Sequence, residues 1–228
     1  MLLPPIHPAA GAAGLSGKGN VVELTHYQQP EEKAPVICPR LDYNACRLRL
    51  VEGKARAGKK PYMKLGCSSQ SYDAALQQKK LGLFSWIDLC AEVLALDGIE
   101  IEDKHLPSTE PAFLRELRQR VAQRGLILSS LTIMNNFGLA TAPERAAQLD
   151  YLRRGLEMAR ELGAPVLRIF AGWPAQQNDE ALWAEMIECL KRACGYAEQA
   201  GVRLALENHN HGGFVRVGED ALRVFEQV

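Results

Sequence analysis

The sequence predicts an α/β fold of parallel strands, and three observations support this prediction. From residue 63 onward, short apolar runs alternate with longer segments in which apolar residues recur every three or four positions. Five such strand–helix units follow one another, each of about 30–40 residues, which suits a βαβ repeat. Hydrophobic residues make up 47% of the chain, enough to bury a large core. Strict alternation implies parallel strands joined by right-handed helical crossovers.

The strands are predicted from the apolar runs that stop at polar or glycine-containing loops. Buried parallel strands have this pattern because both of their faces are covered. The runs lie at residues 63–67, 98–102, 126–133, 166–170 and 202–206.

The helices are predicted from apolar stripes and end signals. The first, at 84–96, has Trp86, Leu89, Val93 and Leu96 on one stripe. The third, at 143–162, is followed by a glycine that can end it.

The remaining helices have similar signals. Ser108 resembles an N-cap with Pro111 in the first turn of the second helix, and Gly125 ends that helix. A long helix over about 182–197 precedes Gly201, and a last amphipathic segment begins near Gly218.

The repeat favours a barrel over an open doubly wound sheet. A nucleotide-binding doubly wound sheet places a G-x-G-x-x-G turn after an early strand, and the sequence has none. We therefore expect a parallel (β/α) fold of the TIM-barrel type, with about five of its eight units present. The fifth strand would then be an unpaired edge.

Residues 1–62 differ from the rest of the chain. Prolines recur there among glycines and alanines, and no helical or strand period persists. We expect an irregular or disordered N-terminal segment over 1–62 and a partial barrel domain over 63–228. The basic residues at 54–64 are interpreted as a solvated linker, because no aromatic residues interleave with them.

Composition disfavours several functional classes. The 27 basic and 27 acidic residues balance, so no net field steers nucleic acid or an anionic membrane to the surface. The six cysteines form no C-x-x-C pair, which favours reduced thiols. Prolines interrupt the apolar N-terminus, and no segment is long enough in apolar residues to span a bilayer. We expect a soluble, cytoplasmic protein.

The most informative stretch is LALENHNHGG, from Leu204 to Gly213. An apolar run ends there at Glu207, and His209 and His211 follow at two-residue spacing. Polar side chains at the carboxyl end of a buried parallel strand lie in a crevice where interactions with a cation or a developing charge are strong. Glu207 is therefore the first candidate for a functional residue.

Five motifs together resemble the sugar phosphate isomerase/epimerase family, which has the xylose isomerase-like TIM barrel. The likeness covers about residues 63–228, and its specificity rests on the order and spacing of the motifs. They are KLGCSSQSY, DGIEIEDKH, the Asn-Asn-Phe loop at 135–137, VLRIFAGWP and LALENHNHGG.

The resemblance implies a metal-dependent isomerase or epimerase that acts on a sugar or polyol, or on its phosphate, by proton transfer next to a carbonyl. The metal is a divalent ion such as Mn, Co, Mg or Zn, held by a Glu, an Asp, a His and a Glu after strands five to eight. Only the first of these ligands maps here, onto Glu207, which the resemblance also implies as a catalytic acid/base. The chain therefore looks truncated, and activity of this chain alone is open.

Five residues are candidates for binding the substrate, and each has an alternative. His105 is either in the site or simply exposed at the surface. Arg168 either forms an ion pair inside the barrel or contacts a phosphate or carboxylate. Asn136 offers a neutral hydrogen bond to a hydroxyl. Trp173 lines an apolar wall with Phe137, unless both are loop packing. His209 binds substrate or backbone, or extends a metal site with His211.

The acidic residues have alternatives too. Glu207 is a metal ligand or proton-transfer residue, or else a carboxylate paired with a Lys or Arg. Glu100 and Glu102 are interpreted as filling barrel layers or bonding locally.

Two other functions stay open at this point. One is an endonuclease IV-like zinc phosphodiesterase, which the neutral charge and the few histidines disfavour. The other is a non-catalytic module or an inactive fragment. We expect a small-molecule sugar or polyol as partner, no nucleic acid and no membrane, and leave a homo-oligomer open.

Overall fold

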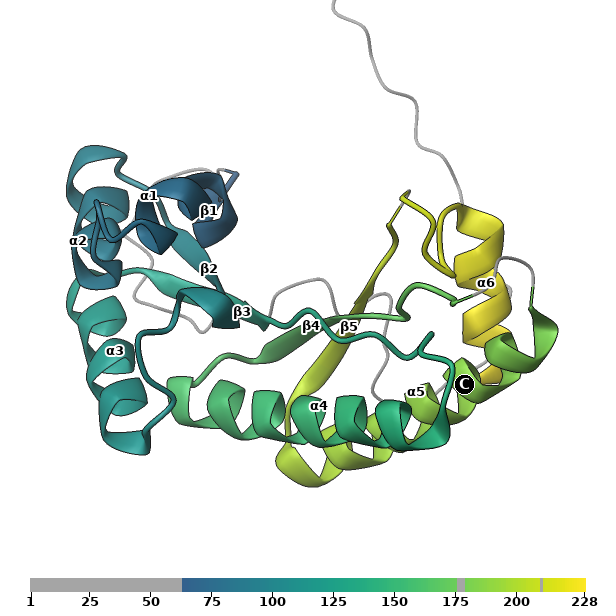
Figure 1. Cartoon of the computed structure of the whole chain (residues 1–228). Helices are drawn as coiled ribbons and strands as arrows, with labels where there is room; N and C mark the ends of the chain where they lie inside the picture. The colour runs from purple at the N-terminus through teal and green to yellow at the C-terminus, as the bar shows by residue number, and fades with distance from the viewer. Residues whose placement is uncertain (1–62, 176–178, 210) are drawn as a thin grey trace, which may run out of the picture. The chain divides into compact units, whose positions relative to one another are not determined.

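A parallel sheet organises the part of the chain that the computed structural model describes, residues 63–175, 179–209 and 211–228. Its strands lie in the order β1-β2-β3-β4-β5 (Figure 1). They are β1 (Gly66–Ser68), β2 (Gly98–Glu102), β3 (Ile127–Thr132), β4 (Val166–Phe170) and β5 (Arg203–Glu207). Neighbours in sequence are neighbours in the sheet, as in a barrel and unlike a doubly wound sheet, where the order reverses. The predicted α/β fold of the TIM-barrel type is confirmed.

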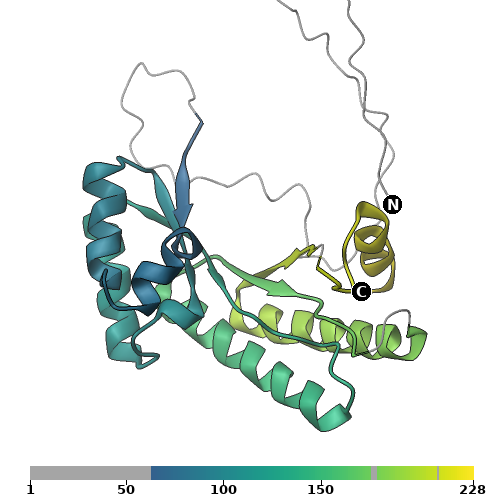
Figure 2. The ribbon, with the colours of Figure 1, turned by 45° about the horizontal axis from the view of Figure 1, so that its top comes forward.

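Helices follow each strand. The main helices are α1 (Asp73–Gln77), α2 (Leu83–Asp88), α3 (Pro111–Gln123), α4 (Ala142–Leu162), α5 (Glu180–Ala200) and α6 (Gly218–Gln227). Two 3₁₀ turns, η2 (Ser69–Tyr72) and η4 (Asp103–His105), follow β1 and β2 directly, and a π-helical turn, η3 (Leu89–Val93), follows α2. Figure 2 shows α4 and α5 side by side beneath the strands, and α3 and α4 both contact β3.

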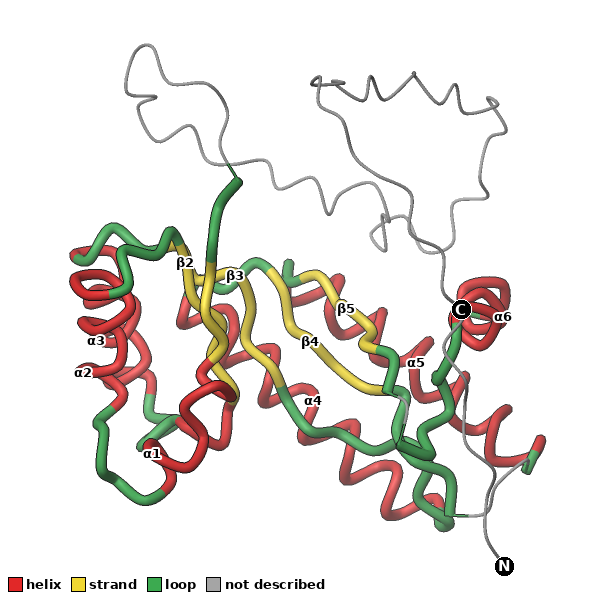
Figure 3. Tube along the Cα trace, turned by 90° about the horizontal axis from the view of Figure 1, so that it is seen from above, coloured by secondary structure: helices red, strands yellow, loops and turns green. Residues whose placement is uncertain are grey.

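The two faces of the sheet differ in polarity. The face toward the helices is apolar and includes Ile133 and Leu167, which lie against Gly155 of α4. The opposite face has polar residues, because side chains alternate along a strand. Glu102 pairs in register with Thr132, and Thr132 pairs with Arg168. A polar row therefore crosses β2, β3 and β4, whose parallel course is visible in Figure 3.

The predicted helix ends are mostly correct. Helix α4 begins with a capping box in which Thr141 and Glu144 bond reciprocally, and it ends at Gly163 with a left-handed φ of 72°. The predicted N-cap at Ser108 is wrong, because α3 begins after Glu110. The Ser108 hydroxyl instead accepts a hydrogen bond from the Glu110 N–H.

The first unit differs most from the prediction. The helix predicted over 84–96 is α-helical only to Asp88 and continues as the π-helical turn η3. The wider turn rotates the following side chains relative to an α-helical stripe. Val93 is therefore 72% exposed, although the stripe predicted it as buried, whereas Trp86 is fully buried as expected. The strand predicted at 63–67 is also displaced, to Gly66–Ser68.

Three other predictions concern the N-terminal segment, the cysteines and membrane-spanning helices. Residues 1–62 lie outside the described part, so the irregular segment and the boundary at 63 stay predictions. Four cysteines within the described residues, Cys67, Cys90, Cys189 and Cys194, are free thiols, as expected. In residues 63–228, apart from 176–178 and 210, no helix has the length and apolar character of a membrane span.

We predict that Gly155→Val destabilises the fold by about 1–3 kcal/mol. A Cβ at Gly155 would lie 3.2 Å from Ile133 Cγ2 and 3.3 Å from Leu167 Cδ2, so two further methyl groups overpack the contact between α4 and the sheet. Urea unfolding measures the loss.

The matched control is Gly195→Val in α5, where an added Cβ meets nothing within 4 Å. We expect its free energy of unfolding to stay the same or rise, because valine is a better helix former than glycine. Equal losses in both variants would contradict the close contact at Gly155.

Candidate active site at the strand ends

A chain of alternating charges runs across the carboxyl ends of the strands. Its members are Asp73, Lys104, Glu102, Arg168 and Glu207, and we call it the charge chain. Lys104 Nζ lies 2.8 Å from Asp73 Oδ1 and 2.9 Å from Glu102 Oε2. Arg168 Nη2 lies 3.4 Å from Glu102 Oε1, and Arg168 Nε lies 2.8 Å from Glu207 Oε2. The charge chain links the loop after β1 to the end of β5.

Arg168 is the central member of the charge chain. Its side chain is only 12% exposed, so its charge needs partners inside the protein. Glu102, 7% exposed, and Glu207 supply them. The guanidinium carbon also lies 4.5 Å from the centre of the Phe170 ring, a cation–π contact. Of the two alternatives for Arg168, the internal ion pair is present in this structure; a contact with substrate stays a prediction.

Glu207 closes β5 beside Phe170 of β4, its partner in register. Its side chain is 44% exposed, and one carboxylate oxygen, Oε2, pairs with Arg168. The ion pair that was the alternative to a chemical role is therefore present. Because the side chain is partly exposed, the carboxylate can still bind or accept a proton, and its role as catalyst and ligand stays a prediction.

Aromatic rings surround the end of β4 and the loop after β5. The rings of Phe170, Trp173, His209 and His211, which we call the aromatic wall, have neighbouring centroids 5.0–5.6 Å apart. A shallow hollow beside the wall is lined by Glu207, Gly172 and Gly213, among others. Phe137 is fully buried, so for this residue the loop-packing alternative is correct. An apolar ring surface therefore lies next to a carboxylate.

Asn136 positions the loop that presents Trp173. Its Oδ1 accepts hydrogen bonds from the Gly138 N–H at 2.9 Å and the Trp173 N–H at 2.8 Å. Gly172 has a φ of 104°, and a Cβ there would lie 2.3 Å from that same oxygen. The neighbouring Asn135 is fully buried and exchanges two hydrogen bonds with the Phe170 backbone. Direct contact between Asn136 and a substrate stays a prediction.

His105 lies inside the protein, so the alternative of simple surface exposure is wrong. Its side chain is 0% exposed. Nδ1 lies 2.8 Å from Ser69 Oγ, and Nε2 lies 2.9 Å from Asp73 Oδ1. Hydrogen bonds from Lys104 and then from His105 lower the pKa of Asp73. Ser69 is fully buried and also accepts the Glu102 N–H, so these three residues brace the loops after β1 and β2 and do not expose a nucleophile. A substrate role for His105 stays a prediction.

Sequence reasoning missed Asp73, Lys104 and Ser69. A signal was available, because all three follow the first or second strand at the carboxyl end where parallel strands place functional groups. Glu102 was interpreted as a local bonding residue, which agrees with its two ion pairs.

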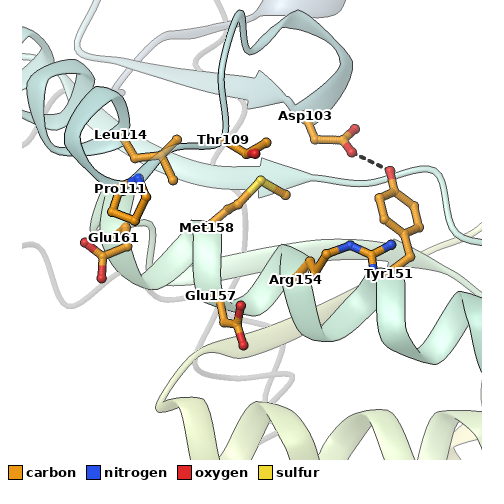
Figure 4. Close-up of a pocket in the computed structure, with 9 residues that line it drawn as sticks. All are labelled: Asp103, Thr109, Pro111, Leu114, Tyr151, Arg154, Glu157, Met158 and Glu161. Atoms are coloured by element: carbon orange, nitrogen blue, oxygen red, sulfur yellow. Dashed lines mark hydrogen bonds between the residues drawn. The ribbon is translucent and has the colours of Figure 1, made fainter.

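A larger cavity, of about 370 Å³, lies away from the strand-end site, between α3 and α4 (Figure 4). The Tyr151 hydroxyl donates to Asp103 at its rim and accepts from the Met134 N–H. Burial raises the pKa of Asp103, and the hydrogen bond from Tyr151 only partly opposes this. The pair joins the loops after β2 and β3 to α4.

We predict that Asp103→Asn becomes more stable relative to the unchanged protein as pH rises. An acid whose pKa is raised by folding favours the fold below its unfolded pKa, near 3.8, and this contribution is lost as pH rises through the folded value. The asparagine variant stays uncharged and lacks this loss. Urea unfolding between about pH 3 and pH 8 measures the difference.

Asp88→Asn is the control of opposite sign. A hydrogen bond from Arg124 lowers the pKa of Asp88, so its contribution is present above the unfolded pKa and lost as pH falls. For each variant, the difference in free energy of unfolding from the unchanged protein is plotted against pH. Slopes of the same sign for Asp103→Asn and Asp88→Asn would contradict these assignments.

The residues present do not assemble the metal site that the resemblance implies. Within the described residues, no group of three or more His, Cys, Asp and Glu side chains could hold a metal ion. Glu207 is the single ligand of the implied set that maps onto this chain, and Arg168 already binds one of its oxygens.

Comparisons with known proteins agree with the fold. The family model described as "Xylose isomerase-like TIM barrel" matches residues 87–228. No curated protein matches the chain. The solved structures show the fold alone, because each is less than 25% identical.

Three solved structures illustrate the likeness. A protein from Sinorhizobium meliloti is 24% identical with a TM-score of 0.59, over 72% of this chain and 58% of that chain. D-psicose 3-epimerase from Clostridium cellulolyticum, solved with D-tagatose, is 18% identical with a TM-score of 0.59, over 72% and 60%. The 3-keto-D-glucoside 4-epimerase of E. coli is 19% identical with a TM-score of 0.56, over 73% and 66%.

This chain therefore spans 58% and 60% of the length of the first two structures. The family model covers more than half of the chain, and its description agrees with the resemblance that the five motifs indicate. The chain belongs to the xylose isomerase-like TIM barrel family.

Proposed function

We propose that this chain contributes the proton-transferring carboxylate, Glu207, of a sugar or polyol isomerase or epimerase. The observation that supports this most is the position of Glu207 at the end of β5, half-exposed and beside the aromatic wall. Membership of the family and the epimerases among the similar structures add support at the level of reaction class.

The proposed reaction needs a base, an acid that returns the proton, and a surface that orients the substrate. Sugars have C–H faces that pack on aromatic rings, and Trp173 and His209 offer such rings next to Glu207. The Glu207 carboxylate takes the proton from the carbon beside the carbonyl, and the electron pair of that C–H bond forms an enediolate. Return of a proton to the neighbouring carbon, with transfer of a proton between the two oxygens, completes an isomerisation. Return of a proton to the opposite face of the same carbon completes an epimerisation and requires an acid on that face.

Arg168 has a positioning role in this proposal. Its Nε lies 2.8 Å from Oε2 of Glu207, so the ion pair keeps the carboxylate beside the strand ends. Glu102 and Phe170 in turn hold Arg168. We propose that His105 and Asn136 act on the substrate site through the loops that they brace, and that Asn136 also presents Trp173.

A divalent ion, Mn, Co, Mg or Zn, belongs to the proposal only where residues outside the described ones supply further ligands, and Glu207 would then be the ligand from this chain. Such an ion polarises the carbonyl and hydroxyl oxygens of a sugar. Within the described residues no group of three or more His, Cys, Asp and Glu side chains could hold it, so no step here depends on the ion.

We predict that Glu207→Gln abolishes exchange of substrate C–H protons with solvent. The 228-residue chain is incubated in D₂O with a panel of ketoses and keto-glycosides, and NMR follows deuterium at the carbon beside the carbonyl. Because a positioned general base contributes about 100-fold or more, the variant should fall to the rate of the blank.

Glu116→Gln, an exposed carboxylate on α3, is the control that should keep the unchanged rate. Undiminished exchange in Glu207→Gln would remove Glu207 from the mechanism. Absence of exchange by the unchanged chain with every sugar would overturn the proposed function for this chain.

A further inference from the structure

We infer that Arg168, and not a divalent metal ion, is the cation that holds Glu207 in this chain. The inference concerns the chain's own side chains, and it stands whether or not the proposed reaction is correct. It rests on three groups that could otherwise serve as ligands: Glu207 itself, Glu102, and the two histidines of the aromatic wall.

Glu207 offers too few donor atoms to retain a metal. Its Oε2 lies 2.8 Å from Arg168 Nε, so this carboxylate already pairs with one cation. Catalytic zinc sites use about three protein ligands, and magnesium and calcium require about six or more oxygens. One carboxylate therefore gives only weak, unspecific binding.

Glu102 is the nearest further carboxylate of the charge chain, and each of its oxygens lies within 3.4 Å of a cation, although Oε2 accepts no hydrogen bond from the described residues. Oε1 lies 3.4 Å from Arg168 Nη2, and Oε2 lies 2.9 Å from Lys104 Nζ. Its side chain is 7% exposed. Glu102 therefore neutralises two cations and is not available as a ligand.

The two histidines are also engaged. The His209 ring lies 5.4 Å from the Trp173 ring and 5.6 Å from the Phe170 ring, centre to centre. His209 Nδ1 accepts the His211 N–H at 3.3 Å. No cluster of three donors forms around them within the described part of the chain. The extension of a metal site by His209 and His211 stays an untested alternative.

The distribution of charge around Glu207 also disfavours a metal ion. Within the charge chain, negative and positive groups alternate from Asp73 to Glu207, and Arg168 lies between two carboxylates. A divalent ion bound at Glu207 would lie within a few Å of the guanidinium, and like charges at that separation repel. Arg168 thus both orients Glu207 and disfavours a second cation there.

The experiment titrates the unchanged 228-residue chain with Mn²⁺ and measures binding by water-proton relaxation. We expect no saturable binding up to about 1 mM free Mn²⁺, and the same result for Glu207→Gln. A micromolar site in the unchanged chain that Glu207→Gln removes would overturn the inference.

Arg168→Met tests the role of the guanidinium directly. Without this charge, the carboxylate of Glu207 becomes available, so Mn²⁺ affinity should rise at least about tenfold. The rise should vanish in the double variant Arg168→Met/Glu207→Gln. A merely structural role for Arg168 predicts no gain in affinity, and absence of a gain in folded protein would overturn the positioning role.

Two controls separate local from general effects. Arg168→Lys keeps the positive charge and should keep the affinity of the unchanged chain. Arg118→Met removes an exposed arginine of α3, so it matches the change in net charge away from the site, and it should also cause no gain. If Arg168→Met does not fold, the comparison of the unchanged chain with Glu207→Gln still decides the first part. The assay uses no sugar, so failure of the inference and failure of the proposed function are seen separately.

Discussion

The need to neutralise one buried guanidinium organises the strand ends. Arg168 lies on the polar face of β4, and its side chain is almost withdrawn from water. A charge in that position is stable only with opposite charges and good geometry around it. Glu102 from β2 and Glu207 from β5 supply the opposite charges, so the ion pairs connect strands on both sides of β4, although Arg168 Nε and Nη1 are buried without a hydrogen-bond partner among the described residues. The same requirement extends through Lys104 to Asp73 in the loop after β1.

The loops around this charge chain are held by neutral hydrogen bonds. Asn135 and Asn136 join the end of β3 to the end of β4, and Ser69 and His105 join the loops after β1 and β2. Polar groups buried in this way rigidify a site when all of them are paired. The aromatic wall then stands on a braced loop, with Glu207 beside it. Ion pairs connect the strands, and hydrogen bonds of asparagine side chains connect the loops. Together they give the strand ends a defined geometry.

The sequence was sufficient for most of the fold. Alternating apolar runs and stripes predict the strands and helices, and Gly163 and Gly201 mark helix ends that the structure confirms as left-handed. The first unit was harder, because a π-helical turn changes the period of the stripe and no local signal announces it. The N-cap prediction at Ser108 was wrong because a serine hydroxyl can accept a backbone hydrogen bond in a turn as well as at the start of a helix.

The sequence predicted where the site lies, at the carboxyl ends of the strands. It did not predict which side chains contact one another there. Because functional residues after parallel strands gather at one edge, the sequence predicted a site at the carboxyl ends of the strands, and Glu207, Arg168 and Trp173 lie at or next to those ends. The partners of each side chain were not predictable, since Asp73 and His105 are 32 residues apart and Glu102 and Arg168 are 66 apart in the chain.

By itself, the sequence determined the class of fold, the order of the units and the edge at which chemistry can occur, because these follow from local periodicity and strand direction. Only the tertiary structure decided that Glu207 pairs with Arg168, that His105 is buried, and that Asn136 supports Trp173. Such pairings depend on which side chains the sheet register brings within a few Å, and register is a property of the folded chain.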